Sequence, residues 1–136
     1  MKENKVDLEK YNPVTHKIIG CAMAVHNQLG NGFQEVIYQR ALALEFKKQD
    51  VSFEREVEMP IYYDNISIGT RRVDFLINNE ILVEIKAITE LNNINYAQII
   101  NYLTAYKLNI GLLINFGEKK LKFKRFVKTI NYGTNY

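Results

Sequence analysis

The chain has one cysteine, Cys21, and two histidines among its 136 residues. A single cysteine excludes a disulfide within the chain and provides no cysteine cluster for zinc. His16 and His26 lie ten positions apart, not the four that would place a metal-binding pair on one face of a helix. We therefore expect neither a disulfide-stabilised domain nor a zinc cluster, and we read both histidines as surface or boundary residues.

Long apolar runs are also absent. The stretch Met1 to Asp7 has no apolar signal core, and no uninterrupted run approaches the roughly 20 residues of a membrane-spanning helix. No repeat or low-complexity linker divides the chain. With 47% hydrophobic and 24% charged residues, the composition is ordinary for a soluble globular protein of one core. We expect a single domain over residues 1–136, located in the cytoplasm, with no membrane partner.

The charge balance is mildly basic. A formal net charge of +3 permits a polyanionic partner without requiring one. Between Gly117 and Lys128, one acid, Glu118, is accompanied by six basic residues: Lys119, Lys120, Lys122, Lys124, Arg125 and Lys128. Lysines that alternate along a strand can protect a sheet edge from aggregation, an interpretation we favour over a patch that follows phosphates.

Charged residues are embedded in the stretch Arg72 to Lys86, which otherwise reads as two strands rich in valine, isoleucine, leucine and phenylalanine. A three-residue loop at 78–80 predicts that Asp74 lies opposite Glu84. A two-residue loop at Asn78-Asn79 would scatter the charges over both faces, so the three-residue loop is the self-consistent register. The apolar face then comprises Val73, Phe75, Ile77, Ile81, Val83 and Ile85.

This register brings the carboxylates of Asp74 and Glu84 together beside the ammonium of Lys86. Two such carboxylates repel unless one is protonated or a cation lies between them. A hard divalent ion such as Mg²⁺ takes oxygen ligands, and Lys86 could then orient or deprotonate a water or stabilise charge on a phosphate. The alternative is a solvated strand face with an ordinary cross-strand pair, which contributes little stability.

Two helices are expected before these strands. The first begins at Asn12-Pro13 and ends at Gly30 to Gly32; the second begins near Gly32 and runs to Phe46. The carboxylate of Glu35 could stabilise the N-terminus of this helix and cap its free amides. Alternatively, it could face the strand carboxylates as a further ligand of a metal ion or a water. Tyr38, one turn on, either hydrogen-bonds to that carboxylate or belongs to the core.

The remaining strands form a mixed pattern. An antiparallel meander of Phe53 to Met59, Ile61 to Tyr63 and Ile66 to Ile68 leads into the Asp74 strand, with Pro60 as a break. The apolar run Ile110–Asn115 is expected to be a buried strand parallel to the Glu84 strand. A last strand covers residues 120–127, and residues 131–136 are expected to be a flexible tail.

A helix between the two parallel strands carries Gln98 and Tyr102 on one face, because they are four positions apart. These side chains could contact a nucleotide backbone or hold Lys86 in place. Alternatively, they pin the helix to the sheet.

Together these features resemble a known group of proteins. Asp74, with Glu84-Ile85-Lys86 on the following strand, resembles the core of the PD-(D/E)xK phosphodiesterase superfamily, although Val73 stands where a proline is typical. More narrowly, Gly32-Phe33-Gln34-Glu35-Val36-Ile37-Tyr38 matches the signature of the small bacterial GxxExxY family. The segment Leu112–Gly117 and the Gln98–Tyr102 pair also resemble that family.

The resemblance covers roughly Ile18 to Val127 and implies a fold. The fold class is α/β, with a restriction-endonuclease-like core and a central mixed β-sheet flanked by α-helices, in the order α-α-β-β-β-α-β-β. Similarity to the exonuclease modules of bacterial recombination nucleases implies that the GxxE helix and the QxxxY helix belong to one active site.

The resemblance also implies metal-assisted hydrolysis of a phosphodiester. Asp74, Glu84 and the carbonyl of Ile85 would hold Mg²⁺ or Mn²⁺, and Glu35 would bind the ion directly or through water. Lys86 would position the nucleophile. Gln98, Tyr102 and Tyr38 would have orienting or nucleic-acid-binding roles, and Arg72 would contact phosphate. The expected partner is nucleic acid, DNA before RNA, with a homodimer or a partner protein as further alternatives. A catalytically inactive binding or assembly module is the competing interpretation.

Overall fold

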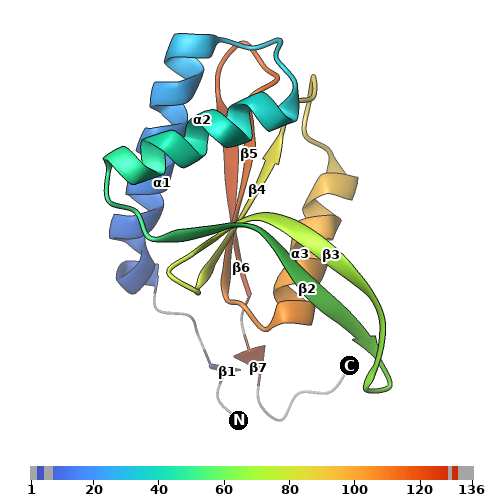
Figure 1. Cartoon of the computed structure of the whole chain (residues 1–136). Coiled ribbons are helices and arrows are strands. Elements are labelled where there is room, and N and C mark those ends of the chain that lie inside the picture. Colours follow the sequence, from blue (N-terminus) through green and yellow to red (C-terminus); the bar gives the residue numbers. More distant parts are fainter. Residues whose placement is uncertain (1–2, 5–7, 129, 132–136) are drawn as a thin grey trace.

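The computed structural model describes residues 3–4, 8–128 and 130–131 (Figure 1). The main elements are α1 (Leu8–Leu29), α2 (Glu35–Lys48), β2 (Phe53–Tyr63), β3 (Ile66–Ile77), β4 (Ile81–Lys86), α3 (Asn93–Tyr106), β5 (Ile110–Asn115) and β6 (Lys122–Val127). This order confirms the predicted one. Two short strands that were not predicted, β1 (Glu3–Asn4) and β7 (Ile130–Asn131), pair with each other. The predicted tail thus begins inside β7, and residues 132–136 lie outside the described residues.

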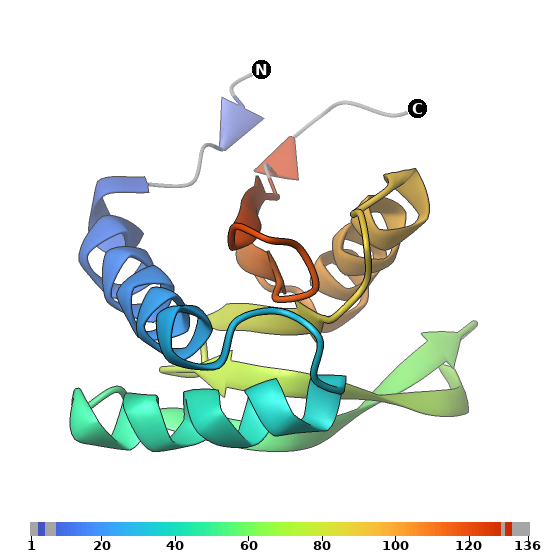
Figure 2. The ribbon, with the colours of Figure 1, turned by 90° about the horizontal axis from the view of Figure 1, so that it is seen from above.

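Five strands form one mixed sheet in the order β2-β3-β4-β5-β6. Strands β4 and β5 are parallel, as expected for strands joined through a helix, and the other neighbours are antiparallel. Helices α1 and α2 cover one face and α3 covers the other, which Figure 2 shows from above. The chain therefore has a restriction-endonuclease-like α/β architecture. No helix in the described part of the chain is long and apolar enough to cross a membrane.

The core is divided into two layers by the sheet. Alternate residues of β4 take opposite faces, so that Ile81, Val83 and Ile85 pack against α1 and α2 while Leu82 packs against α3. All six residues of β5 are buried, as the apolar run Ile110–Asn115 predicted. The central strands are thereby fixed between two apolar layers, which makes their ends a rigid support for polar side chains.

The β3–β4 turn has the predicted register. Asn78 and Asn79 both adopt positive φ angles, 52° and 58°, and the Glu80 amide donates to the Ile77 carbonyl at 2.9 Å. Asparagine tolerates this left-handed conformation better than most residues do. As a result, Ile77 pairs with Ile81, and the three-residue loop is confirmed.

One face assignment is wrong. Val73 was expected beside Phe75, but it packs with Leu82 on the α3 side while Phe75 lies on the other face. Strict alternation fails here because the pairing of β3 with β4 stops at Phe75, and Glu56 on β2 has a positive φ of 56°. The strand is therefore irregular at the residue between them, Asp74.

Two predicted boundaries of the helices are also wrong. Helix α1 begins at Leu8, so Asn12-Pro13 lies inside it; the buried ring of Tyr11 anchors the extra turn in the core. Helix α2 begins at Glu35 because Gly30 and Gly32 adopt φ angles of 69° and 111°, which keep the preceding segment out of the helix.

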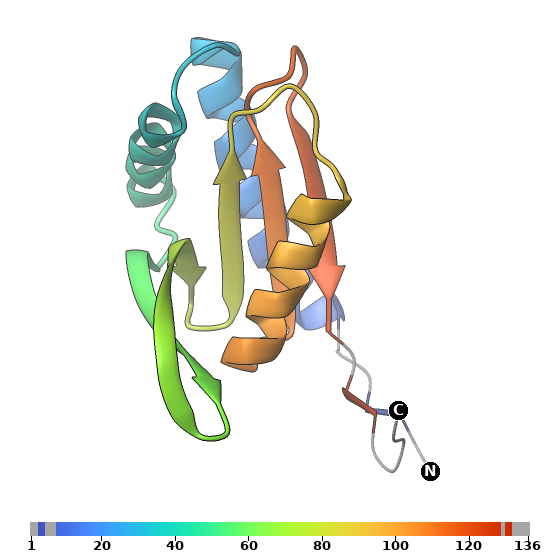
Figure 3. The same ribbon diagram turned by 90° about the vertical axis from the view of Figure 1, so that its right-hand side faces the viewer.

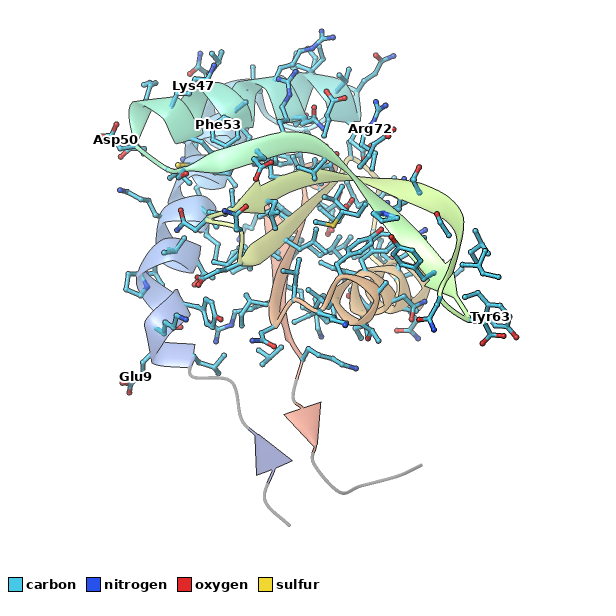
Figure 4. All side chains as sticks on the ribbon, turned by 60° about the horizontal axis from the view of Figure 1, so that its bottom comes forward. Glu9, Lys47, Asp50, Phe53, Tyr63 and Arg72 are labelled. Carbon is cyan, nitrogen blue, oxygen red and sulfur yellow. The ribbon has the colours of Figure 1, made fainter. Side chains whose placement is uncertain are left out.

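Pro60 does not break its strand. Strand β2 is continuous through Pro60, which pairs with Thr70 of β3. An edge strand tolerates a residue without an N–H group, and β2 is the edge of the sheet. The long β2–β3 ribbon projects past the other strands and ends near Tyr63 (Figures 3 and 4).

Candidate active site

The side chain of Asp74 lies where β3 separates from β4. Its Oδ2 accepts a hydrogen bond from the backbone nitrogen of Ile85 at 2.7 Å, and its Oδ1 accepts one from Nε2 of Gln39 at 2.8 Å. The first bond ties the carboxylate to β4 and the second ties it to α2. Asp74 is thus held from two sides beside Glu84.

Glu84 of β4 is 5% exposed, and its Oε1 atom has no hydrogen-bond partner among the described residues. Burial raises the pKa of Glu84 to about 8, helped by the charge of Asp74 and by a hydrogen bond with its side chain. The charges of Arg71 and Lys86 oppose this rise in pKa. The two carboxyl groups therefore converge, and they need a shared proton or a cation to remain together.

Glu35 is the first residue of α2, and its carboxyl lies close enough to Asp74 and Lys86 of the strands for their charges to act on it. The residue as a whole is exposed, but its carboxyl is partly removed from solvent, which raises its pKa. The negative charge of Asp74 raises this pKa further, by a smaller amount. The charges of Lys86 and Arg71 lower it. Of the two alternatives drawn from the sequence, a carboxyl near the strand carboxylates is favoured, because the charge of Asp74 contributes to the raised pKa of Glu35.

Lys86 is half-buried at the end of β4 and acts electrostatically on both Glu35 and Glu84. Within residues 8–128, it forms no ion pair. Its carbonyl accepts from the Phe116 amide at 2.8 Å. The next turn is held by Asn115, whose side chain accepts from the Ile88 amide at 3.0 Å and donates to the Ile88 carbonyl at 2.9 Å.

Gly117 completes this support behind Lys86. A Cβ atom at Gly117 would overlap the backbone nitrogen and carbonyl oxygen of Ile88 and would lie 2.6 Å from the Ala87 carbonyl carbon. Only glycine allows the two backbones to approach so closely. The segment from Asn115 to Gly117 therefore fixes the end of the strand that carries Glu84 and Lys86.

The donor set fits a hard divalent cation. In the described residues, no three side chains of histidine, cysteine, aspartate or glutamate are close enough to form a metal cage. Asp74 and Glu84 nevertheless provide two converging carboxyls, and the unpartnered, buried Oε1 of Glu84 lacks the positive partner that a cation would supply. Mg²⁺ is commonly held by one or two carboxylates together with water and substrate oxygens.

On the α3 side, Tyr102 meets Arg71, a residue for which the sequence alone predicted no role. The Nε of Arg71 donates to the Tyr102 hydroxyl, and the guanidinium lies 5.3 Å from the centre of the Tyr102 ring. The rings of Tyr102 and Tyr106 stack 6.0 Å apart. Gln98 is half-buried on the same helix, and its side chain makes no hydrogen bond to the described part of the chain.

Two predicted site residues lie apart from this group. Arg72 binds Glu56 at 3.2 Å and Glu58 at 3.4 Å, on the side of β3 turned away from α3 (Figure 4). Tyr38 is fully buried, stacked on Phe116 with ring centres 4.7 Å apart. Its hydroxyl donates to the carbonyl of Gly30 at 2.6 Å, so it orients the loop before α2 and does not contact the Glu35 carboxylate.

Gln39 and Arg71 are the residues of this site that sequence reasoning missed. Gln39 stands four positions after Glu35, one helical turn on the same face, and this spacing is a signal for it. For Arg71, strand parity gives only part of the signal. Arg71 and Arg72 must face opposite sides, so one of the two adjacent arginines was bound to face α3.

Comparisons with known proteins agree with this geometry. The family model of the PD-(D/E)XK nuclease superfamily matches residues 12–126, and the chain belongs to this superfamily. The matched range contains every candidate residue from Glu35 to Tyr102. None of the curated proteins matches the sequence significantly.

Similar folds are found among the solved structures. The crystal structure of a protein named SSO0001 shares 22% identical residues with the chain, with a TM-score of 0.53. The match covers 69% of this chain and 50% of that protein, so the chain spans about half of its length. At this level of identity, the similarity concerns the fold alone.

Proposed function

We propose that this protein is a metal-dependent nuclease that hydrolyses phosphodiester bonds of nucleic acid, with DNA as the expected substrate. The observation that carries the proposal is the pair of Asp74 and Glu84, whose carboxyls converge beside Lys86 and leave a buried Glu84 oxygen without a partner among the described residues. Membership of a nuclease superfamily supports it. The motif from Gly32 to Tyr38 supports a finer assignment to the GxxExxY family.

Asp74 and Glu84, with the carbonyl of Ile85, would hold Mg²⁺ or Mn²⁺, and Glu35 would contact the ion through water. When bound, such an ion lowers the pKa of a coordinated water and neutralises charge on the phosphate. Hydrolysis adds one water across a P–O bond and leaves a phosphomonoester and a free hydroxyl.

The protein side chains supply position and charge. Lys86 orients the attacking water, since its ammonium lies beside the carboxyls without being bound in an ion pair to the described residues. Gln98 and Tyr102 lie on α3, where they can orient the nucleic-acid strand. Glu84, whose pKa is raised to about 8 in the metal-free protein, gains its ionised form once the cation is present, because an adjacent positive charge favours the carboxylate.

The decisive experiment is a cleavage assay on single-stranded, double-stranded and branched DNA and on RNA. Each substrate is incubated with Mg²⁺, Mn²⁺ or a chelator. We expect metal-dependent cleavage by the wild type and its loss in Glu84→Gln and in Lys86→Ala. Glu58→Gln is the matched control, because Glu58 is an exposed carboxylate of β2 that contacts only Arg72 among the described residues.

The competing function, an inactive binding or assembly module, makes a different prediction. The wild type would then cleave none of the substrates with either metal ion, yet it would bind nucleic acid with an affinity that falls as salt rises. Sedimentation of the protein alone and with DNA would show whether a homodimer forms. Cleavage at the wild-type rate by correctly folded Lys86→Ala would remove the role assigned to Lys86.

A further inference from the structure

Arg71 is fixed by an aromatic side chain beside the carboxyl pair. It stands three residues before Asp74 on β3 and faces α3, where it is half-buried. Tyr102 contacts it twice, through a hydrogen bond from Nε and through the face of the ring, 5.3 Å from the guanidinium. Both contacts come from one side chain of α3, so they restrain the orientation of the guanidinium before any ligand arrives.

The outer edge of this guanidinium is free to bind an anion. Arginine has five N–H donors, and Tyr102 takes the one on Nε. Within the part of the chain that the structure describes, no carboxylate lies within ion-pair distance of Arg71. The two terminal nitrogens therefore keep the planar fork that matches two oxygens of a phosphate.

The position of this fork relative to the carboxyls indicates its ligand. The charge of Arg71 acts on Asp74 and Glu84 and on Glu35 of α2, so the guanidinium lies next to the proposed site of hydrolysis. The neighbouring Arg72 differs in both respects. Its fork is taken by Glu56 and Glu58, and it lies on the other side of the strand.

We propose that Arg71 binds a phosphate of the nucleic-acid backbone at the carboxyl pair, and that Tyr102 is the positioning residue that aims it. This inference rests on the proposed nuclease function and reassigns the phosphate contact from Arg72 to Arg71. It also gives α3 a specific task. The helix places one phenol behind one arginine, and the arginine contacts the substrate.

The test compares Arg71→Ala, Arg71→Lys and Tyr102→Phe with Arg72→Ala as the matched control. Binding of a fluorescein-labelled DNA, in the strand form that the wild type cleaves or binds best, is measured over a range of salt in chelator. Loss of one phosphate contact lowers the slope of log affinity against log salt by about 1. We expect this change in Arg71→Ala, a wild-type slope in Arg71→Lys, and no change in Arg72→Ala.

Cleavage kinetics test the positioning role. We expect kcat/KM to fall about 10- to 100-fold in Arg71→Ala, the range for a lost charge-assisted hydrogen bond. Arg71→Lys is expected to recover little of the lost kcat/KM, because an ammonium lacks the planar pair of donors of a guanidinium. Tyr102→Phe should lower kcat/KM in the wild-type background and have no further effect when Arg71 is alanine. A purely structural phenol would instead show equal effects in both backgrounds.

The outcomes separate this inference from the proposed function. Metal-dependent cleavage by the wild type, with an unchanged salt slope and kcat/KM in Arg71→Ala, would overturn the role of Arg71 alone. A wild type that never cleaves would overturn the nuclease function, and the salt slope in chelator would still decide whether Arg71 contacts phosphate. Thermal unfolding of each variant checks the fold, and Arg71→Lys serves as the binding comparison if alanine unfolds the protein.

Discussion

The Asp74 carboxylate accepts the backbone N–H of Ile85 at 2.7 Å, so a side chain of β3 takes a donor of β4 at the point where the pairing of the two strands ends. This bond explains how an irregular strand can still hold Asp74 against Glu84. It also means that Asp74 has two separate tasks. It satisfies donors of the fold, and it is a proposed ligand of the cation.

Substitution of Asp74 should separate these tasks. In Asp74→Asn, the amide oxygen can still accept from Ile85. The new NH₂ group can donate to Gln39 Oε1 once the Gln39 side-chain amide turns over, because in the wild type it is Nε2 of Gln39 that faces Asp74. In Asp74→Ala, both donors lose their acceptor, at a cost of about 1–3 kcal/mol each. We therefore expect urea unfolding in chelator to show near-wild-type stability for the asparagine variant and a clear loss for the alanine variant.

Both Asp74 variants should lose metal-dependent cleavage, because an amide oxygen is a weaker ligand for a hard cation than a carboxylate. Full cleavage activity in Asp74→Asn would contradict the ligand role. Equal stability of the two variants would contradict the structural role of the bond to Ile85.

Glu84 should make the stability of the metal-free protein depend on pH. Its folded pKa is raised to about 8 from an ordinary 4.5, so the folded state holds a proton that the unfolded state releases. The resulting stability is complete below about pH 4.5 and is lost as pH rises toward 8. At about 1.4 kcal/mol for each pKa unit, we expect a loss on the order of 2 to 5 kcal/mol.

The check is urea unfolding from pH 5 to pH 9 in chelator, for the wild type and for Glu84→Gln. Glutamine stays neutral, so the variant should be similar to the wild type at pH 5 and more stable than it at pH 9. Addition of Mg²⁺ at pH 9 should stabilise the wild type and leave Glu84→Gln nearly unchanged. If the unfolding free energies of the wild type and Glu84→Gln changed in parallel with pH, Glu84 would not be the group responsible for the pH dependence.

The sequence was sufficient to predict the central hairpin because its turn and its charges constrain each other. Only one register keeps Asp74 and Glu84 together, and the structure has that register in the pairing of Ile77 with Ile81. The position of β5 in the sheet was also predictable from the sequence. Its continuous apolar run requires burial on both faces, which only a central strand provides.

Local irregularity limited what could be predicted for the site. Strand parity cannot foresee that alternation fails between Val73 and Phe75, because the pairing of β3 with β4 stops at Phe75 and Glu56 on the neighbouring strand has a positive φ angle. It was also silent on which of two adjacent arginines faces α3. That choice depends on Tyr102, which is distant in sequence and near in space.

Alanine substitutions at Gly117 and at Gly20 should have opposite effects on stability. In Gly117→Ala, the new methyl would collide with the backbone of Ile88, so the turn behind Lys86 must move. We expect a loss of about 1–3 kcal/mol in unfolding free energy and reduced cleavage. Gly20 is the matched control. It lies in α1, where an added methyl group would meet nothing within 4 Å, and Gly20→Ala should stabilise the helix by about 0.5–1 kcal/mol without affecting cleavage.

Tyr38→Phe should loosen the loop that precedes Glu35. The ring and its stacking on Phe116 remain, but the hydroxyl that donates to Gly30 and accepts from the Phe33 amide at 3.2 Å is lost. We expect a cost of about 1 kcal/mol in chemical denaturation and faster amide exchange at Phe33.

Cleavage tests what this loop does for the site. If the hydroxyl of Tyr38 fixes the start of α2, Tyr38→Phe should lower kcat by misplacing Glu35 and leave DNA affinity in chelator unchanged, because a fully buried ring cannot contact nucleic acid. Tyr63→Phe, at the exposed end of the β2–β3 ribbon, is the control for loss of a hydroxyl alone. A fall in DNA affinity in Tyr38→Phe with unchanged kcat would show that the loop binds substrate and does not position Glu35.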